Sequence, residues 1–201
     1  MSAMDVFIFL VLGTIMYFGG YQPYFYFQHI TFNRARELSG IFVKLDNKIP
    51  FRPAWIWMYT VFYYPVVVIV SVAAAHNHRQ FVYIAFSYMI MLAVMIIFFI
   101  IFPVKIPAQW RVYDRNKSLS HRFLSFTQGI DDSNNCFPSG HAAISVITAY
   151  HMAAYVGNVW AGIFSLLVIL SCLYTKQHYL IDVIAGELLG FMVIWIYLLM
   201  I

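Results

Sequence analysis

Charged residues are scarce in this 201-residue sequence, where Asp, Glu, Lys and Arg together occupy 10% of the positions. A soluble domain carries about a quarter charged residues, so the composition excludes an ordinary soluble fold. Hydrophobic residues fill 63% of the chain and aromatic residues 19%. We therefore expect an integral membrane protein with the bilayer as its surroundings and no nucleic-acid partner.

Cysteine is also rare, and a secretory signal is missing. The two cysteines, Cys136 and Cys172, cannot form a disulfide framework, and Cys172 lies within an apolar run. The N-terminal stretch MSAMDVFIFLVLG lacks the basic region and the small-residue cleavage site of a secretory signal peptide. We expect this stretch to be retained as the first membrane span.

Six apolar runs approach the ~20 residues that a helix needs to cross a bilayer. The predicted spans are about residues 5–27, 54–75, 81–104, 139–156, 159–174 and 183–201. The fourth and fifth are short, which indicates extension into neighbouring residues or a thin local bilayer. The predicted fold class is all-α, a single integral-membrane domain of six helices over residues 1–201.

The basic residues are distributed unevenly among the gaps between these spans. Eleven of the twelve Lys and Arg residues lie in the first, third and fifth gaps, and only Arg79 lies in another gap. With six spans, those three gaps face the same side. The positive-inside rule makes that basic face cytoplasmic and places both termini outside. Alternatively the cations are there to bind phosphate. Their distribution then does not tell which side of the membrane this face lies on.

The first and third gaps show further features. In an interfacial segment at about residues 30–53, apolar residues follow near-helical intervals among basic ones: Phe32, Leu38, Ile41, Phe42 and Leu45. That pattern predicts a helix in the headgroup plane, with an ordinary loop as the alternative. The third gap is long and polar, and long loops in compact bundles are often functional.

The fifth gap contains HYLID, in which His178 and Asp182 stand four residues apart. On a helix they share one face, so the carboxylate can accept the Nδ1–H of the imidazole. Nε2 is then left as a nucleophile or a base. The alternative is a structural His–Asp pair at a helix end. We expect no metal site, since neither an H-E-x-x-H motif nor a third ligand at a recognisable spacing is present.

The stretch FPSGHAA, residues 137–143, stands where a polar loop turns into an apolar segment. Pro138 can begin a helix at little cost. Ser139 and Gly140 would then present a hydroxyl and unobstructed N–H groups at the positive helix end, which suits phosphate. His141 follows, placed to donate a proton to a leaving group. Two histidines, one backed by aspartate, together indicate phosphoryl transfer.

FPSGHAA and HYLIDVIAG resemble the second and third signature motifs of the type 2 phosphatidic acid phosphatase superfamily of membrane enzymes. P-S-G-H and H-x-x-x-D match in full, in the family's order and two spans apart. The resemblance implies a phosphohistidine mechanism without metal or other cofactor. It also implies that His178 attacks phosphorus, that Asp182 orients it and that His141 protonates the leaving oxygen. Ser139 and Gly140 would bind the phosphoryl oxygens.

The family's pattern is incomplete in two places. Where the family has Ser-Arg ahead of the third-motif histidine, this chain has Ser171 and Cys172, so a bidentate phosphate clamp is missing. Lys176 is nearby but lacks the guanidinium fork. The first motif, usually Lys, six residues, Arg and Pro, is matched in part by Lys105 and Arg111. We expect Lys105, Arg111 and Lys176 to contact phosphate.

The missing clamp bears on the reaction. A phosphomonoester carries close to two charges and a phosphodiester one, so the loss suits head-group transfer, as in the similar inositol phosphorylceramide and sphingomyelin synthases. The short chain and its layout favour a lipid phosphatase, with Arg115 or Arg122 as alternative phosphate contacts. We predict a membrane phosphatase acting on a lipid phosphate or diphosphate. The alternatives are a phospho-head-group transferase and a non-catalytic lipid-phosphate binding protein.

Overall fold

The computed structural model describes residues 3–131 and 133–201, and helices dominate this part of the chain. The α-helices are α1 (Ala3–Thr31), α2 (Ile41–Asp46), α3 (Tyr63–Ala73), α4 (His78–Ile101), α5 (Leu119–Ile130), α6 (Gly140–Val156), α7 (Asn158–Tyr174) and α8 (Leu180–Met200). Two short strands, β1 (Arg36–Glu37) and β2 (Val104–Lys105), pair in parallel. The predicted all-α fold class is confirmed.

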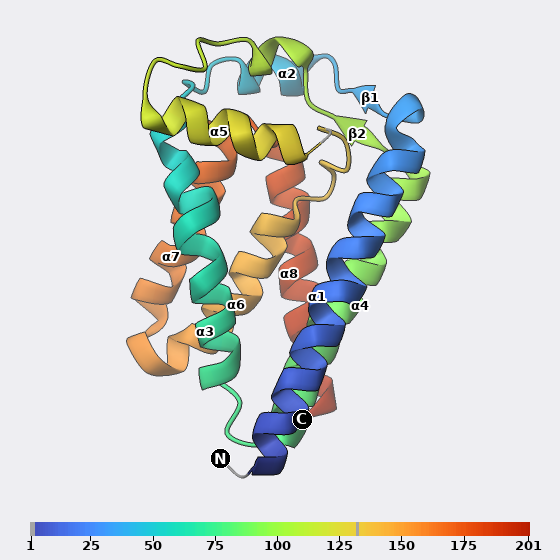
Figure 1. Ribbon diagram of the computed structural model, residues 1–201, viewed down its shortest axis with the longest axis vertical. Coiled ribbons are helices and arrows are strands. Elements are labelled where there is room, and N and C mark those ends of the chain that lie inside the picture. Colours follow the sequence, from blue (N-terminus) through green and yellow to red (C-terminus); the bar gives the residue numbers. More distant parts are fainter. Residues whose placement is uncertain (1–2, 132) are drawn as a thin grey trace.

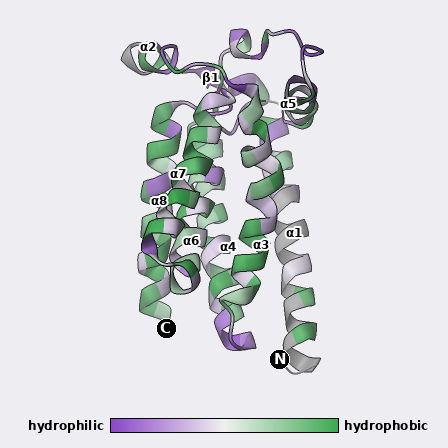
Figure 2. Ribbon diagram, turned by 90° about the vertical axis from the view of Figure 1, so that its left-hand side faces the viewer, coloured by the Kyte–Doolittle hydropathy of each residue, from purple (hydrophilic) through white to green (hydrophobic). Residues whose placement is uncertain are grey.

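Among the residues that the structure describes, three helical segments are long and apolar enough to cross a membrane: Pro53–Ala73, His78–Ile101 and Leu180–Met200. The first of them begins as the 3-10 turn η2 (Pro53–Trp55), continues through the π-helical turn η3 (Trp57–Phe62) and ends as α3. Helix α7 is apolar but shorter. Hydrophobic residues are concentrated along the upright helices, and hydrophilic residues gather at their ends (Figure 2). The protein is therefore a helical membrane protein, and six crossings stay a prediction.

Helix α6 has neighbours on several sides, since it packs against α3, α4, α7 and α8, while α1 lies along α4 (Figure 1). Two glycines let α8 approach α6 closely. A Cβ atom at Gly186 would collide with the carbonyl oxygen of Ser139, and one at Gly190 would lie 2.8 Å from the carbonyl oxygen of Ala143. GELLG is therefore a small-xxx-small packing motif. This close packing sets the distance between α6 and α8, the two helices that begin within the FPSGHAA and HYLIDVIAG motifs.

Helices α2 and α5 lie across one end of the bundle, opposite to both chain termini (Figure 1). The interfacial segment predicted at about residues 30–53 does not form one long helix. It forms the 3-10 turn η1 (Phe32–Arg34), then β1, and only six residues of α-helix in α2. The helix is interrupted because the chain turns to pair with β2, and Arg36 N–H donates to the Pro103 carbonyl oxygen at 3.1 Å. Its place in the headgroup plane stays a prediction.

The long polar gap contains a helix, α5, that the sequence analysis did not predict. The Ser118 hydroxyl caps its N-terminus by accepting the N–H of His121 at 3.4 Å. Leu124 is fully buried, whereas Leu119 is 67% exposed and Phe126 is 65% exposed. The helix thus has apolar residues on both its inner and its outer side. Polar residues interrupt that pattern in the sequence, which is why the segment resembles a loop.

Candidate active site

His141 and His178 approach each other at the polar end of the bundle, with their ring centroids 6.2 Å apart. His141 is the second residue of α6, and His178 lies in the turn between α7 and α8. A backbone hydrogen bond joins the two motifs, because the Ser139 N–H donates to the Asp182 carbonyl oxygen at 2.9 Å. Segments far apart in the sequence therefore place two imidazoles side by side.

The orientation of the His178 ring is set by a backbone carbonyl. Its Nδ1 lies 3.0 Å from the Cys136 carbonyl oxygen, and a carbonyl oxygen only accepts hydrogen bonds. Nδ1 is therefore the protonated nitrogen, and in the neutral ring Nε2 carries the free lone pair. From the sequence we expect Asp182 to orient this ring, but the nearer acceptor is the carbonyl of Cys136.

Asp182 is fully buried in the first turn of α8. Its Oδ2 accepts the Tyr179 N–H at 2.9 Å and lies 3.7 Å from His178 Nδ1. Oδ1 has no hydrogen-bond partner within the described parts of the chain. The shared helix face predicted for His178 and Asp182 is wrong, because His178 precedes the first residue of α8. The two are instead neighbours where the helix begins.

The Cys136 carbonyl is held in place from both sides. The Cys136 N–H donates to the Val104 carbonyl oxygen at 3.1 Å, so the loop adds to the end of β2. Just before it, the Asn134 side chain donates to the Gln28 carbonyl oxygen at 2.6 Å, which ties the loop to α1. The Cys136 thiol donates to the Ser133 carbonyl oxygen at 3.2 Å. The acceptor for His178 is therefore fixed by α1 and β2 together.

His141 packs against tyrosine rings from the π-helical turn and α3. The Tyr59 ring stacks on it at a centroid distance of 4.0 Å and an interplanar angle of 20°, and Tyr63 lies 4.7 Å away. Its Nε2 is buried, and no residue that the structure describes hydrogen-bonds to it. The stacked rings fix the imidazole plane and leave one nitrogen available to a ligand. No motif in the sequence indicated these tyrosines.

The start of α6 differs from the prediction in one respect. The helix begins at Gly140, with Ser139 as its cap and Pro138 outside it. Ser139 is fully buried, and its hydroxyl accepts the Ala142 N–H at 3.4 Å. Its hydroxyl therefore serves the helix and is not presented outward. The N–H groups of Gly140 and His141, in the first turn, have no intrahelical acceptor and remain suited to an anion.

Among the predicted cations, Arg111 contacts the end of α5. Its Nη1 donates to the carbonyl oxygens of Gln128 at 2.9 Å and Asp131 at 2.7 Å. Its Nε is buried and has no partner among the described residues. The Gln128 amide lies 3.4 Å from the side-chain oxygen of Gln177, which immediately precedes His178. Arg111 thus holds the end of α5, and Gln128 joins that end to the turn that carries His178, while the Arg111 Nε stays without a partner in the described chain.

The structure places Lys176 away from the two histidines. Its Nζ donates to the Asp46 carbonyl oxygen at 2.5 Å and lies 4.9 Å from the centre of the Trp110 ring. Burial lowers the pKa of Lys176, and the nearby Asp46 opposes that shift. Lys105 is in β2, where its backbone carbonyl accepts the Tyr179 hydroxyl at 3.1 Å. The Lys176 ammonium is thus already bound, whereas the Arg111 Nε has no partner among the described residues.

Two residues that the sequence analysis overlooked hold the turn before α8. The Asp46 carboxylate accepts the Leu180 N–H at 2.8 Å and is 1% exposed. The Tyr179 hydroxyl accepts the Leu38 N–H at 3.2 Å and donates to Lys105. Burial raises the pKa of both side chains, Asp46 and Tyr179. Local spacing contains no signal for these contacts, because the partners are 74 to 141 residues apart.

Cys136, His178 and Asp182 bring possible metal-ligand atoms within 4.8 Å of one another. Binding would require the thiol and Nδ1 to lose their protons, which now donate to carbonyl oxygens. Burial raises the pKa of the Cys136 thiol well above its usual value, which opposes that loss. The cluster therefore fits a hydrogen-bonded support better than a resident metal site. Independence from metal stays a prediction.

Comparison with known proteins gives one match. A family model described as the PAP2 superfamily matches residues 41–196, which is most of the chain and includes both histidine motifs. No curated protein and no solved structure matches.

Proposed function

The chain belongs to the PAP2 superfamily, and we propose that it hydrolyses a lipid phosphomonoester or diphosphate through a phosphohistidine intermediate. Membership of this superfamily supports a phosphatase-like enzyme that acts on lipid phosphates. The observation that carries this proposal is the 6.2 Å separation of the His141 and His178 rings. Two imidazoles at this distance are able to act on opposite sides of one phosphorus atom, one on the attacking side and one on the leaving-group side.

In the first step, His178 Nε2 attacks phosphorus. A P–N bond forms as the bond between phosphorus and the lipid oxygen breaks, and protonated His141 gives its Nε2 proton to the departing oxygen. The Nδ1–H bond to the Cys136 carbonyl keeps the lone pair on Nε2. The nearby Asp182 carboxylate, 3.7 Å from Nδ1, stabilises the positive charge that develops on the ring.

In the second step, water attacks the phosphohistidine. Neutral His141 accepts a proton from that water, the P–N bond breaks, and inorganic phosphate leaves. His178 is regenerated neutral and His141 is regenerated protonated, so the cycle closes without an external oxidant, reductant or metal. The Tyr59 stack supports this exchange by holding the His141 ring in one plane.

The phosphoryl oxygens are proposed to bind the backbone N–H groups of Gly140 and His141 at the N-terminus of α6. That helix end has unpaired N–H groups and a positive dipole, which stabilise charge on an oxyanion. The unused Nε of Arg111 is the proposed side-chain donor. Ser139 supports the cradle as the helix cap, and Lys105 and Lys176 act at most on the surrounding structure.

Head-group transfer to a lipid hydroxyl is the second candidate, and one observation favours it. The position at which the family has arginine holds Cys172, which is fully buried, and Lys176 is bound to Asp46. Neither replaces the missing clamp, which leaves fewer cations for a dianionic monoester. In this case His178 displaces the lipid oxygen of a phosphodiester and carries the phosphate with its head group still attached. A lipid hydroxyl, in place of water, then gives its proton to His141 and attacks phosphorus, and the P–N bond breaks to release the new phosphodiester.

The test is turnover by purified protein in detergent with a panel of lipid phosphates, measured as inorganic phosphate released. We expect His178→Ala to lower the rate by about a thousandfold or more, because the nucleophile is lost. His141→Ala should lower it about 10²–10⁴-fold. His76→Ala, which changes an exposed histidine at the opposite end, is the control and should act like the wild type.

The outcomes separate the candidates. Release of inorganic phosphate without an added alcohol supports hydrolysis. Product found only as a phosphodiester on an added lipid hydroxyl supports transfer and rejects the phosphatase. Lipid-phosphate binding without turnover of any substrate in the panel supports a non-catalytic binding protein.

A further inference from the structure

A groove of about 400 Å³ opens at the polar end of the bundle, outside the contacts described above for the two histidines. One wall is residues 51–55, the stretch FRPAW. The other wall is the start of α5, with Lys117, Ser118, Ser120 and His121. Neither His141 nor His178 lines it, so this groove is a separate feature of the molecule.

The groove is basic. Arg52 and Lys117 line it and are exposed, and no carboxylate of a residue that the structure describes lies within salt-bridge distance of either. His121 adds an imidazole, whose Nδ1 lies 2.7 Å from the Ser118 hydroxyl. The lining contains no acidic residue. An anion that enters therefore meets two unpaired cations and the N-terminus of a twelve-residue helix.

The groove also lies where a membrane begins. Pro53, one of its lining residues, is the first residue of a segment long and apolar enough to span a bilayer. Phe51 and Trp55 line it as well, and aromatic side chains favour the level of the lipid headgroups. The neighbouring Leu119 is 67% exposed. Lipid phosphates are concentrated at this depth, so a lipid headgroup is a better match than a free anion.

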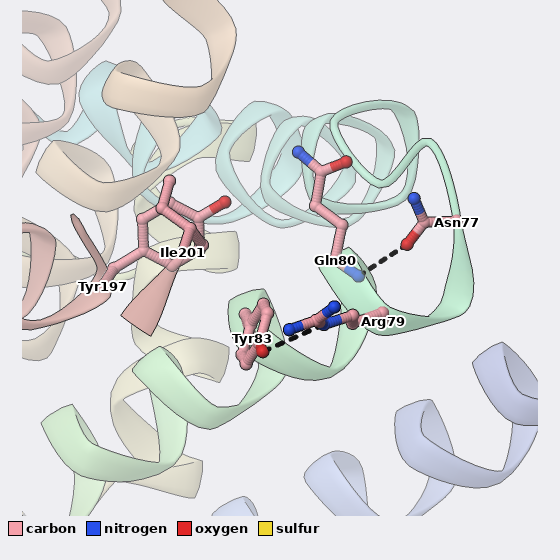
Figure 3. A pocket seen from close by; sticks show the side chains of 6 residues that line it. All are labelled: Asn77, Arg79, Gln80, Tyr83, Tyr197 and Ile201. Carbon is pink, nitrogen blue, oxygen red and sulfur yellow. Dashed lines mark hydrogen bonds between the residues drawn. The ribbon is translucent and has the colours of Figure 1, made fainter. Parts of the chain in front are cut away.

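A groove at the opposite end of the bundle contains an arginine whose side chain is already bound within the protein. There the Arg79 Nε donates to the Tyr83 hydroxyl at 3.1 Å, as Figure 3 shows. Its guanidinium also lies 5.6 Å from the centre of the same ring. In contrast, the structure gives the Arg52 side chain no such partner among the described residues. Of these two grooves, the Arg52 groove has the cations whose side chains bind no described residue.

We propose that this groove binds the phosphate-bearing headgroup of an anionic membrane lipid through Arg52 and Lys117. It is close to the catalytic turn. Arg52 N–H donates to the Tyr174 carbonyl oxygen at 2.8 Å, and the Trp55 and Tyr174 rings lie 5.1 Å apart. Tyr174 is the last residue of α7, four residues before His178. A bound lipid would therefore stand beside the reaction site without occupying it.

The experiment is native mass spectrometry of the full chain in detergent with phosphatidylglycerol or phosphatidylcholine. We expect retention of phosphatidylglycerol over phosphatidylcholine, and at least about tenfold weaker retention in the double variant Arg52→Gln/Lys117→Gln. Arg52→Lys/Lys117→Arg keeps both charges and should bind like the wild type. The matched control Arg79→Gln/Lys48→Gln removes two exposed charges outside the groove and should also retain the lipid.

Equal phosphatidylglycerol retention by the Arg52→Gln/Lys117→Gln variant and the wild type would overturn the proposal. So would displacement of the lipid by an equal concentration of inorganic phosphate, which would identify the ligand as a free anion. The proposal does not depend on the reaction at the histidines. Binding by an inactive His178→Ala variant should match the wild type, so loss of the catalytic hypothesis and loss of this site are distinguishable.

Discussion

Asp46 accepts a hydrogen bond from the Leu180 backbone N–H at 2.8 Å, across 134 residues of the chain. Leu180 is the first residue of α8, so the Asp46 side chain satisfies an N–H that the helix itself leaves without a partner. The same residue accepts the Lys176 ammonium through its backbone carbonyl. Asp46 therefore fastens both ends of the turn that carries His178.

From this contact we predict that Asp46→Ala lowers kcat with little change in KM. The turn loses its anchor, and removal of a helix-capping acceptor costs about 0.5–2 kcal/mol. Asp46→Asn keeps an acceptor oxygen and should retain most activity, since the second carboxylate oxygen has no partner in the described chain. The measurement is kcat and KM for both variants with a thermal melt of each. Equal activity of wild type and Asp46→Ala would show that the turn does not need this residue.

A second prediction concerns the approach of α8 to α6. Gly186→Ala should destabilise the protein by about 1–3 kcal/mol and reduce activity, because the new methyl group meets the Ser139 carbonyl and pushes the two motifs apart. The control is Gly162→Ala in α7, where a Cβ atom has nothing within 4 Å. That variant should be neutral or more stable, since alanine favours helix more than glycine does. Similar thermal melts for the two variants would contradict the packing argument.

A third prediction concerns metal ions. Activity should survive exhaustive treatment with a chelator, because the proposed steps use only side chains and water. Added Zn²⁺ should inhibit only in excess and more strongly at higher pH, because Cys136, His178 and Asp182 offer three ligand atoms within 4.8 Å but the thiol and Nδ1 must first lose their protons. Cys136→Ser keeps the carbonyl that orients His178 and should need about tenfold more Zn²⁺ for the same inhibition. Activity that falls in chelator and returns with a divalent ion would reject the metal-free mechanism.

A fourth prediction concerns the side of the membrane that the site faces. Both native cysteines are buried, with Cys136 4% exposed and Cys172 0% exposed, so an impermeant thiol reagent should leave the wild type unlabelled. Lys117→Cys and His76→Cys place exposed thiols at the two ends of the bundle. If the basic end is cytoplasmic, intact cells should label only His76→Cys, and permeabilised cells should label both. Labelling of Lys117→Cys in intact cells would reverse the orientation.

The candidate site shows which of its residues a local sequence pattern can predict. The motif residues His141, His178 and Asp182 were identified from the sequence, and the structure brings them together. Their partners were predicted less well. The carbonyl that orients His178 belongs to Cys136, and backbone atoms have no sequence signature. Lys176 is close to His178 in sequence, yet its ammonium binds Asp46. Proximity along the chain does not tell which way a long side chain points.

Apolar run length and composition were enough to predict a helical membrane protein, and the two motifs were enough to select His141 and His178 as candidates for the chemistry. Those conclusions rest on the length of the apolar runs and on residue type. Both are local properties of the sequence and do not depend on how the helices pack. The tertiary structure decided which nitrogen of His178 is free, that Ser139 caps a helix, and that Arg52 and Lys117 share a groove. Each of these depends on a contact between segments that only folding brings together, so no stretch of sequence contains it.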